Sequence, residues 1–312
     1  MRSAAGRGGI CGRLPAPSTG STTRASRSTC ASRGDHLPAD LARIRVQAHG
    51  PRRDAGATAE RPQRERLQRA VQRFDHFLVR SEHDVRTLAR AYRLPEEKLL
   101  RTGYPRNDVL LAARVRTRPR AAAAPGARRD ARPADHKKVV LYAPTFRDAA
   151  GRRGRRRLVL DVARFAERFG DTYTLLVRAH YLEAARLPVC PPGTVVDVSR
   201  HHDVSELLAL ADVLVTDYSS IMFDYALLDR PIVLFAPDLD AYAADRGSYF
   251  DLREKAPGPV AESEEELFAV LARLKAADTG YQERRSAFAE EFGGYDRGTR
   301  PARSSPPCSP AT

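Results

Sequence analysis

The sequence predicts an α/β protein whose C-terminal half forms a doubly wound parallel sheet. Short apolar runs rich in Val and Leu, at 138–144, 173–177 and 213–215, are typical of buried parallel strands. Apolar residues at helical spacing lie between such runs, for example over 203–210. Because strands and helices alternate, we expect helices on both faces of a single sheet.

Composition sets the broad class of the protein. Its 312 residues are enough for two domains of ordinary size. A net charge of +14, carried almost wholly by arginine, favours a polyanionic substrate or an anionic membrane surface. The four cysteines show no metal or disulfide spacing, and no apolar run reaches the roughly 20 residues of a membrane span. We therefore expect a cytoplasmic protein, peripheral at the inner face of the cell membrane, that uses no metal and no cofactor.

The two ends of the chain lack folding signals. Residues 1–66 contain thirteen arginines and no Phe, Tyr or Trp, so they cannot bury enough apolar surface to offset the chain entropy of folding. Disorder is expected there, with a basic nucleic-acid-binding arm as the functional alternative. Residues 294–312 are expected to form a disordered tail.

Three segments of different character lie between these ends. Residues 67–113 are predicted to fold, with a strand at 77–79 and a helix that begins after the N-cap Ser81. Residues 114–136, made mostly of Ala, Arg, Pro and Gly, are expected to form a linker. Residues 137–293 hold the alternating strands and helices of a larger domain.

Shorter elements are also predicted from apolar spacing. Residues 94–100 are expected to form a short helix or turn, and residues 158–169 a helix. A further strand is expected at 195–198.

Polar residues follow the predicted strands at the edge where open α/β sheets bind ligands. Arg178 and His180 come after one strand, and Thr145 comes after another. A third strand is followed by a polar turn with Ser219 and Ser220, at the start of a helix. Unpaired backbone N–H groups and the two hydroxyls can hold a phosphate there, although a serine N-cap on an ordinary βα unit is the simpler alternative.

Six motifs in order resemble those of the CDP-glycerol glycerophosphotransferase family, the teichoic acid polymerases. Five of them lie in residues 139–255 and resemble the catalytic region of the family. The sixth lies upstream and has the sequence Gly-Tyr-Pro-Arg-Asn-Asp. The motifs are Gly103–Asp108, Leu141–Arg147, Leu176–Tyr181, Val196–Ser199, Ala211–Ser220 with Phe223–Tyr225, and Arg246–Asp251.

The resemblance implies a GT-B-like architecture of two domains. Residues 137–293 would bind the donor CDP-glycerol, and residues 67–113 would be the remnant of an incomplete, acceptor-side N-terminal half. The implied reaction transfers glycerol phosphate from CDP-glycerol to the terminal hydroxyl of a growing poly(glycerol phosphate) chain and releases CMP. The implied partners are this donor, a poly(glycerol phosphate) or lipid-linked acceptor, and an anionic membrane surface contacted through basic patches, with no specific nucleic acid.

The same resemblance implies roles for individual residues. His180 would lie beside the transferred phosphate, as a hydrogen-bond donor or an acid to the leaving CMP, with a structural histidine as the alternative. Asp224 would orient a donor hydroxyl or the serines. Arg106 would contact the donor phosphates unless it only belongs to a tight Gly/Pro turn, and Asp217 is expected to stabilise its own turn. The expected donor-binding residues are Arg106, Pro144, Thr145, Arg178, Ser219, Ser220 and Asp224.

One family motif is missing from the sequence. The family carries an upstream Trp-His-Gly motif whose His is the presumed general base, and this chain has no Trp. If residues 40–43 are encoded GAC CTG GCA CGG, the same bases read Thr-Trp-His-Gly one nucleotide later. Residues up to about 66 would then be translated out of frame, and loss of the His would impair transfer. The dipeptide at 49–50, His-Gly, has flanks that do not match and is given no role.

Alternatives stay open at this point. The same fold could use CDP-ribitol, or it could be another GT-B glycosyltransferase that takes a nucleotide sugar. A non-enzymatic, arginine-rich nucleic-acid binder would act through residues 1–66 and 114–157. The carboxylates Asp238 and Asp240 could chelate a metal, but the start of a loop is the simpler interpretation.

Overall fold

The computed structural model describes residues 68–115, 126–127, 133, 136–145, 158–179, 187–240 and 251–298. The predictions for residues 1–66, for most of the 114–136 linker, for His180 and for the tail after residue 298 lie outside the described residues. Of the helices within the described ranges, none is both long and apolar enough to span a membrane.

The larger sheet of the described residues has six strands, all parallel. They are β3 (Lys138–Tyr142), β4 (Tyr173–Val177), β5 (Val195–Asp197), β6 (Val213–Thr216), β7 (Ile232–Phe235) and β8 (Val260–Ala261). Their spatial order is β5-β4-β3-β6-β7-β8, so the chain steps outward from β3 on one side and then on the other. This reversal defines a doubly wound sheet, and the predicted fold class is confirmed.

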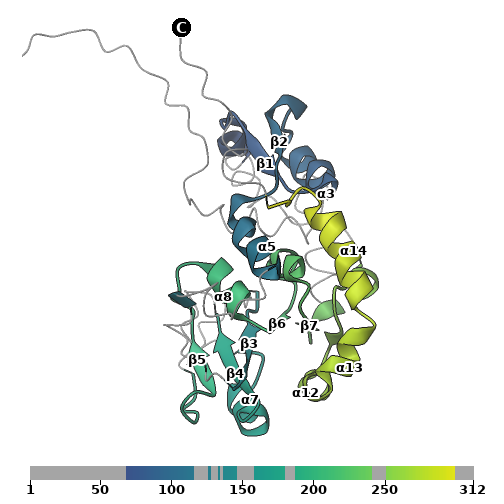
Figure 1. The fold of residues 1–312 in the computed structure, drawn as a ribbon. Helices are drawn as coiled ribbons and strands as arrows, with labels where there is room; N and C mark the ends of the chain where they lie inside the picture. Colours follow the sequence, from purple (N-terminus) through teal and green to yellow (C-terminus); the bar gives the residue numbers. More distant parts are fainter. Residues whose placement is uncertain are drawn as a thin grey trace, which may run out of the picture.

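Helices cover both faces of this sheet (Figure 1). Those described are α5 (Asp108–Val115), α7 (Val162–Phe169), α8 (Val204–Leu210), α9 (Ile221–Tyr225), the 3₁₀ turn η6 (Ala226–Leu228), α11 (Leu252–Lys255), α12 (Glu264–Ala272), α13 (Leu274–Thr279) and α14 (Gln282–Gly293). Strand side chains alternate between two cores: Val139 and Leu141 pack with α5, α8, α9 and α14, whereas Val140 and Tyr142 pack with α7 and α12. Burial on both faces explains why the strands are continuously apolar.

A smaller lobe precedes the large sheet in the chain. Its elements are β1 (Phe77–Val79), α3 (Glu82–Asp84), the π-helical η1 (Val85–Ala89), α4 (Arg90–Tyr92), η2 (Glu96–Lys98), β2 (Leu99–Arg101) and η3 (Pro105–Asn107). The predicted N-cap is confirmed, because Ser81 Oγ accepts a hydrogen bond from the N–H of Asp84 at 3.2 Å. The short helix or turn predicted for 94–100 is wrong at its end, because Leu99 and Leu100 form a strand that pairs in parallel with β1.

The two lobes share helices. The helix α14 packs against α9 and η6 beside the large sheet and also against α3 in the smaller lobe (Figure 1). The ring of His83 in α3 lies 4.7 Å from the ring of Phe292 in α14. The helix α5 packs into the core of the large sheet through Leu110 and Ala113, although the sequence predicts that these residues belong to the N-terminal segment 67–113. The chain therefore joins the larger domain before residue 113.

Two predicted boundaries shift for local reasons. The helix expected over 158–169 begins at Val162, because Asp161 is its N-cap and accepts hydrogen bonds from the N–H groups of Ala163 and Arg164 at 3.0 and 3.1 Å. The strand expected over 195–198 ends one residue earlier, at Asp197.

Parts of the predicted linker and tail pack against the core. Ala127 is buried, and its N–H donates to the carboxylate of Glu206 in α8 at 2.8 Å. Residues 294–298 lie against the smaller lobe, where Asp296 is 9% exposed and accepts a hydrogen bond from the N–H of Tyr104 at 2.7 Å. A polar contact in each case holds a segment whose composition alone predicted no structure.

Candidate functional site

Three neighbouring strands end at the same edge of the large sheet. β3 lies between β4 and β6 and is in parallel register with both. The segments that follow these strands therefore start side by side, and they carry Thr145, Arg178, and the pair Ser219 and Ser220. The strand order reverses between β3 and β6, and ligands of open α/β sheets bind in the crevice at such a reversal. The structure thus gathers the predicted donor-binding residues of the larger domain at this edge.

Hydrogen bonds join the segments after β3 and β6 across the reversal. Asp217 is buried, and its carboxylate accepts from the backbone N–H of Thr145 at 2.8 Å and from the Thr145 hydroxyl at 2.5 Å. The hydroxyl of Thr216 donates to the carbonyl oxygen of Ala143 at 2.7 Å. Asp217 therefore connects two segments, whereas the sequence predicted a contact within its own turn.

The proton of the Thr145 hydroxyl is already engaged. A hydroxyl has one proton, and phosphate oxygens only accept hydrogen bonds, so Thr145 cannot donate to Asp217 and to a phosphate at once. Pro144 and Thr145 are both half-buried. Their assignment to the donor stays a prediction, and the geometry favours a positioning role for Thr145.

Arg178 follows β4 at the same edge and is half-buried. Its Nη1 donates to the carbonyl oxygen of His201 at 2.8 Å, which ties this edge to the segment after β5. Burial lowers the pKa of the Arg178 guanidinium, which nevertheless stays a cation in any ordinary buffer. His180, the predicted catalytic residue, follows two positions later and lies outside the described residues.

Ser219 and Ser220 lie where the sequence predicts them, between a buried strand and a helix. Ser220 is the N-cap residue of α9, but its side chain makes no capping hydrogen bond. The hydroxyl of Ser219 accepts only a long hydrogen bond, 3.4 Å from the N–H of Ile221. Ordinary N-capping therefore accounts for Ser219 weakly and for Ser220 not at all.

Arg106 and Asp224, predicted separately from the sequence, contact each other. Asp224 Oδ2 accepts from Nε of Arg106 at 3.3 Å and from its Nη2 at 3.1 Å. The guanidinium carbon of Arg106 lies 4.6 Å from the ring centroid of Tyr104 in a cation–π contact. Arg106 also belongs to the short turn η3, so the predicted turn is present, and the contact of Arg106 with the donor phosphates stays a prediction.

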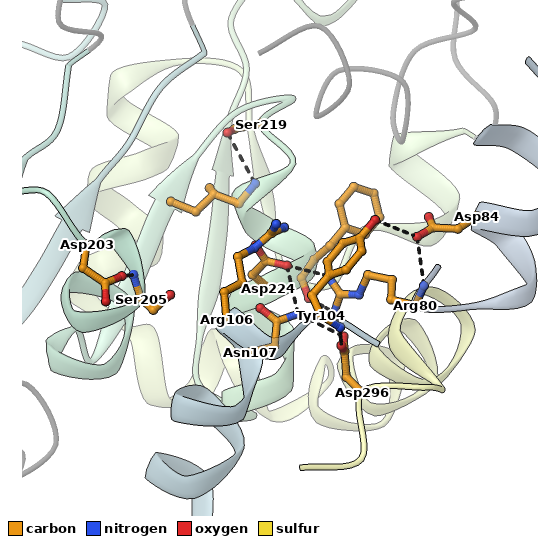
Figure 2. A network of polar contacts seen from close by, with 12 residues as sticks. Arg80, Asp84, Tyr104, Arg106, Asn107, Asp203, Ser205, Ser219, Asp224 and Asp296 are labelled. Carbon is orange, nitrogen blue, oxygen red and sulfur yellow. Dashed lines mark hydrogen bonds and ion pairs between the residues drawn. The ribbon is translucent and has the colours of Figure 1, made fainter. Parts of the chain in front are cut away.

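A buried ionic network lies behind this pair (Figure 2). Arg80 is fully buried; its Nη1 lies 2.5 Å from Asp224 Oδ1 and its Nη2 lies 2.6 Å from Asp296 Oδ2. The amide nitrogen of Asn107 donates to Asp296 at 3.0 Å and to Asp224 at 3.4 Å. The network connects the end of β1, the turn η3, the helix α9 and the segment after α14.

The segment that carries Asp296 packs closely against the segment that carries Gly103. Burial raises the pKa of its carboxyl, and the charge of Arg80 opposes that rise. Gly103 has a φ of +73°, and a Cβ at this residue would lie 2.5 Å from Asp296 Oδ1. Glycine is therefore required at 103 both by its backbone conformation and by the adjacent carboxylate.

Sequence reasoning gave no site role to Arg80, Asn107 or Asp296. Arg80 directly follows the strand 77–79, so a cation at a strand end was a usable signal. The sequence signal for Asp296 was weaker, because this residue lies in a segment whose composition predicted a disordered tail. Pairing between residues so distant in the chain leaves no local pattern.

The carboxylates Asp238 and Asp240 point to different partners. Asp238 Oδ1 accepts from the hydroxyl of Tyr218 at 2.9 Å. Asp240 pairs with Nη1 of Arg253 at 2.8 Å. The two side chains therefore make separate contacts, and the loop expected after them lies outside the described residues.

A doubly wound sheet joined to a smaller parallel lobe, with polar side chains between them, defines a GT-B-like α/β protein. The family model for CDP-glycerol:poly(glycerophosphate) glycerophosphotransferase matches residues 46–303. The chain therefore belongs to this family. The match extends beyond the region 139–255 on both sides, and it includes 46–66 and 294–303, which the sequence pattern had not assigned to the fold.

Characterised relatives support this membership. The teichoic acid glycerol-phosphate transferase of Staphylococcus aureus is 35% identical over 233 residues, which are 71% of this chain and 57% of that protein. The teichoic acid poly(glycerol phosphate) polymerase of Staphylococcus epidermidis is 35% identical over 243 residues, 74% of this chain and 32% of that protein. A teichoic acid poly(ribitol-phosphate) polymerase of Bacillus spizizenii is 30% identical over 65% of this chain and 32% of its own length. The chain thus spans from about a third to somewhat over half of these relatives.

Solved structures agree with the fold. The wall teichoic acid polymerase TagF has a TM-score of 0.70 and 32% identity, over 82% of this chain and 62% of that one. A histidine-to-asparagine variant of TagF soaked with CDPG has a TM-score of 0.72 and 31% identity, over 81% and 62% of the two chains.

Proposed function

We propose that this protein transfers glycerol phosphate from CDP-glycerol to a poly(glycerol phosphate) teichoic acid chain and releases CMP. The observation that carries the proposal is the position of Arg178, Ser219 and Ser220 at one edge of the sheet, after the two strands that flank β3 where the strand order reverses. The description of the matching family and the glycerol phosphate named in the relatives support the choice of substrate.

The chemistry needs a held diphosphate and a stabilised leaving group. The oxygen of the acceptor hydroxyl attacks the phosphorus that carries the glycerol, the bond from that phosphorus to the bridging oxygen breaks, and CMP leaves. Arg178 and the hydroxyl of Ser220, which makes no capping hydrogen bond, suit the negative charge that develops on the bridging oxygen. We assign His180 to the same oxygen as hydrogen-bond donor or acid.

The proton of the acceptor hydroxyl must pass to a base. We propose that the missing Trp-His-Gly motif weakens this step, so that donor binding survives better than turnover. The family match begins at residue 46, so the frame hypothesis applies to residues before it. The nucleotide sequence around codons 40–43 tests the hypothesis, and codons that do not read Thr-Trp-His-Gly one nucleotide later end it.

The decisive experiment mixes the purified full chain with CDP-glycerol and a glycerol phosphate primer, and follows donor binding and CMP release together. Primer-dependent release of CMP supports the transfer reaction. Binding without release supports a donor site that lacks its base. Absence of binding by a chain with a cooperative thermal transition would contradict the CDP-glycerol assignment.

CDP-ribitol is the second candidate donor. The 30% identity to a poly(ribitol-phosphate) polymerase favours it, because that relative shares much of the same region. Competition between CDP-glycerol and CDP-ribitol for the purified chain, read as relative affinity, separates the two. We expect CDP-glycerol to bind at least several-fold more tightly. Membership of the family argues against the sugar-nucleotide and nucleic-acid alternatives.

We also propose that the protein works at the inner face of the cell membrane, on a lipid-linked acceptor. The net charge of +14 supports this, because anionic lipid attracts basic segments. Co-sedimentation with vesicles tests it: binding to vesicles that contain phosphatidylglycerol, lost with pure phosphatidylcholine or in high salt, is the expected result.

A further inference from the structure

Arg106 is held in a fixed orientation while part of its guanidinium stays exposed. Asp224 Oδ2 accepts from its Nε and Nη2, and the ring of Tyr104 supports its face at 4.6 Å. The side chain is still 42% exposed. A guanidinium has five N–H donors, and this contact uses two of them, so the remaining edge can donate to an anion.

The exposed edge lies close to the candidate donor site. Asp224 follows Ser220 by four residues, and positions four apart share one face of a helix. Figure 2 shows the Arg106 side chain between Asp224 and the turn that carries Ser219. An anion bound at the serines is therefore within the neighbourhood of Arg106.

The orientation of Asp224 is set from its buried side by Arg80. Asp224 Oδ1 accepts from Arg80 Nη1 at 2.5 Å, while Oδ2 faces Arg106. Arg80 is itself fixed, because it is 0% exposed, pairs with Asp296 at 2.6 Å and donates to the carbonyl oxygen of Phe223 at 3.2 Å. One carboxylate is thus shared between a buried cation and an exposed one.

Tyr104, the other support of Arg106, is fixed by the same network. Its N–H donates to Asp296 at 2.7 Å, and its hydroxyl donates to Asp84 at 3.3 Å. Asp84 in turn accepts from the backbone N–H of Arg80 at 3.2 Å. Both contacts that orient Arg106 therefore lead back to Arg80 within two hydrogen bonds.

We propose that Arg80 is a positioning residue that orients Arg106 toward the diphosphate of the nucleotide donor, acting through Asp224. Because Arg80 shares Asp224, that carboxylate does not fully neutralise Arg106, and the exposed edge keeps a positive potential. Asp296 offsets the charge of Arg80 on its far side. This inference rests on the proposed function, since it deepens the account of the same site.

A double-mutant cycle on the full chain tests the proposal, with CDP-glycerol affinity measured by calorimetry. The variants are Arg80→Lys, Arg106→Ala and the two combined. Arg106→Ala should weaken binding about tenfold or more, and Arg80→Lys about fivefold. In the Arg106→Ala background, Arg80→Lys should change affinity by less than about twofold, because there is no guanidinium left to orient. An equal loss in both backgrounds, or no loss in either, overturns the proposal.

Arg101 provides matched controls. It lies in the same lobe, is 37% exposed and pairs with Glu82 outside the network. Arg101→Lys and Arg101→Ala change the same chemical groups and should leave the affinity for CDP-glycerol unchanged. A loss as large as that of Arg80→Lys would mean that replacing any arginine of this lobe weakens binding, and it would overturn the proposal.

A second variant covers the case in which Arg80→Lys does not fold. Asp224→Asn keeps the shape of the side chain and removes its charge, and the cycle with Arg106→Ala should again be non-additive. Additive losses would mean that Asp224 contacts the donor directly, which overturns the positioning role. A folded wild type that does not bind CDP-glycerol contradicts the proposed function itself, whereas wild-type binding with an additive cycle contradicts only this inference.

Discussion

The sheet edge and the buried network are both polar, but the chain builds them in different ways. At the edge, Thr145, Arg178 and Ser219 each follow a strand, and the parallel sheet brings them together. In the network, Arg80 at the end of β1 pairs with Asp224 in α9 across 144 residues of sequence, and no strand pairing joins these two segments. The first region is half-buried and can meet a ligand, whereas the second is closed. Topology therefore places the binding groups, and long-range ion pairs fix how they point.

The largest effect on stability is expected when the charge of Arg80 is removed, because this tests whether the buried ion pairs hold the network together. Arg80→Met leaves Asp296 buried without its cation and Asp224 with only the exposed Arg106, and should lower the free energy of unfolding by about 3–5 kcal/mol. Urea unfolding followed by circular dichroism measures it. The control Arg101→Met removes only exposed ion pairs and should cost less than about 1 kcal/mol. Equal losses for the two variants would mean that the network is no more than surface charge.

Glycine substitutions separate backbone strain from crowding by the network. Gly103 and Gly193 both have positive φ, at +73° and +76°, but only Gly103 has a carboxylate, that of Asp296, where a Cβ would go. Gly193→Ala should cost about 1 kcal/mol from strain alone, and Gly103→Ala about 1–3 kcal/mol more. Thermal unfolding of the two variants gives the difference. Similar values would show that Asp296 moves aside easily and that the network is not rigid there.

A substitution at Thr145 tests the polar contacts at the sheet edge. Thr145→Val removes the hydroxyl that donates to Asp217 and should cost about 0.5–1.5 kcal/mol of stability, while Thr145→Ser should retain most of it. Since that proton is engaged in the free protein, CDP-glycerol affinity should fall by no more than a few-fold. Unchanged stability with a hundredfold loss of affinity would instead place the hydroxyl on the donor.

Much of this architecture follows from local sequence. The apolar runs at 138–144, 173–177 and 213–215 overlap the central strands β3, β4 and β6, and polar residues after them mark the binding edge. The N-cap Ser81 could also be predicted from local sequence, because its side chain accepts from an N–H group only three residues away, that of Asp84. The strand β2 was missed, since it directly follows the 3₁₀ turn η2 and the two were predicted as one short helix or turn.

The network was not predictable in the same way. Asp224 was assigned to the donor from its place in a motif, and only the structure shows that both of its oxygens hold arginines. Asp296 is ordered by the N–H of Tyr104 and by Arg80, neither of which is near it in sequence. The composition of a segment predicts whether it can bury apolar surface. It does not predict whether ion pairs with distant residues hold the segment in place.

Hydrogen exchange with mass spectrometry, with and without CDP-glycerol, tests the central claim most directly. The account predicts that the donor slows amide exchange at residues 143–145 and 217–221, at the reversal of strand order, and leaves β1 and α3 unchanged. Protection confined to residues 77–92, with none at the ends of β3 and β6, would contradict it, because the donor would then bind the smaller lobe and not the sheet edge.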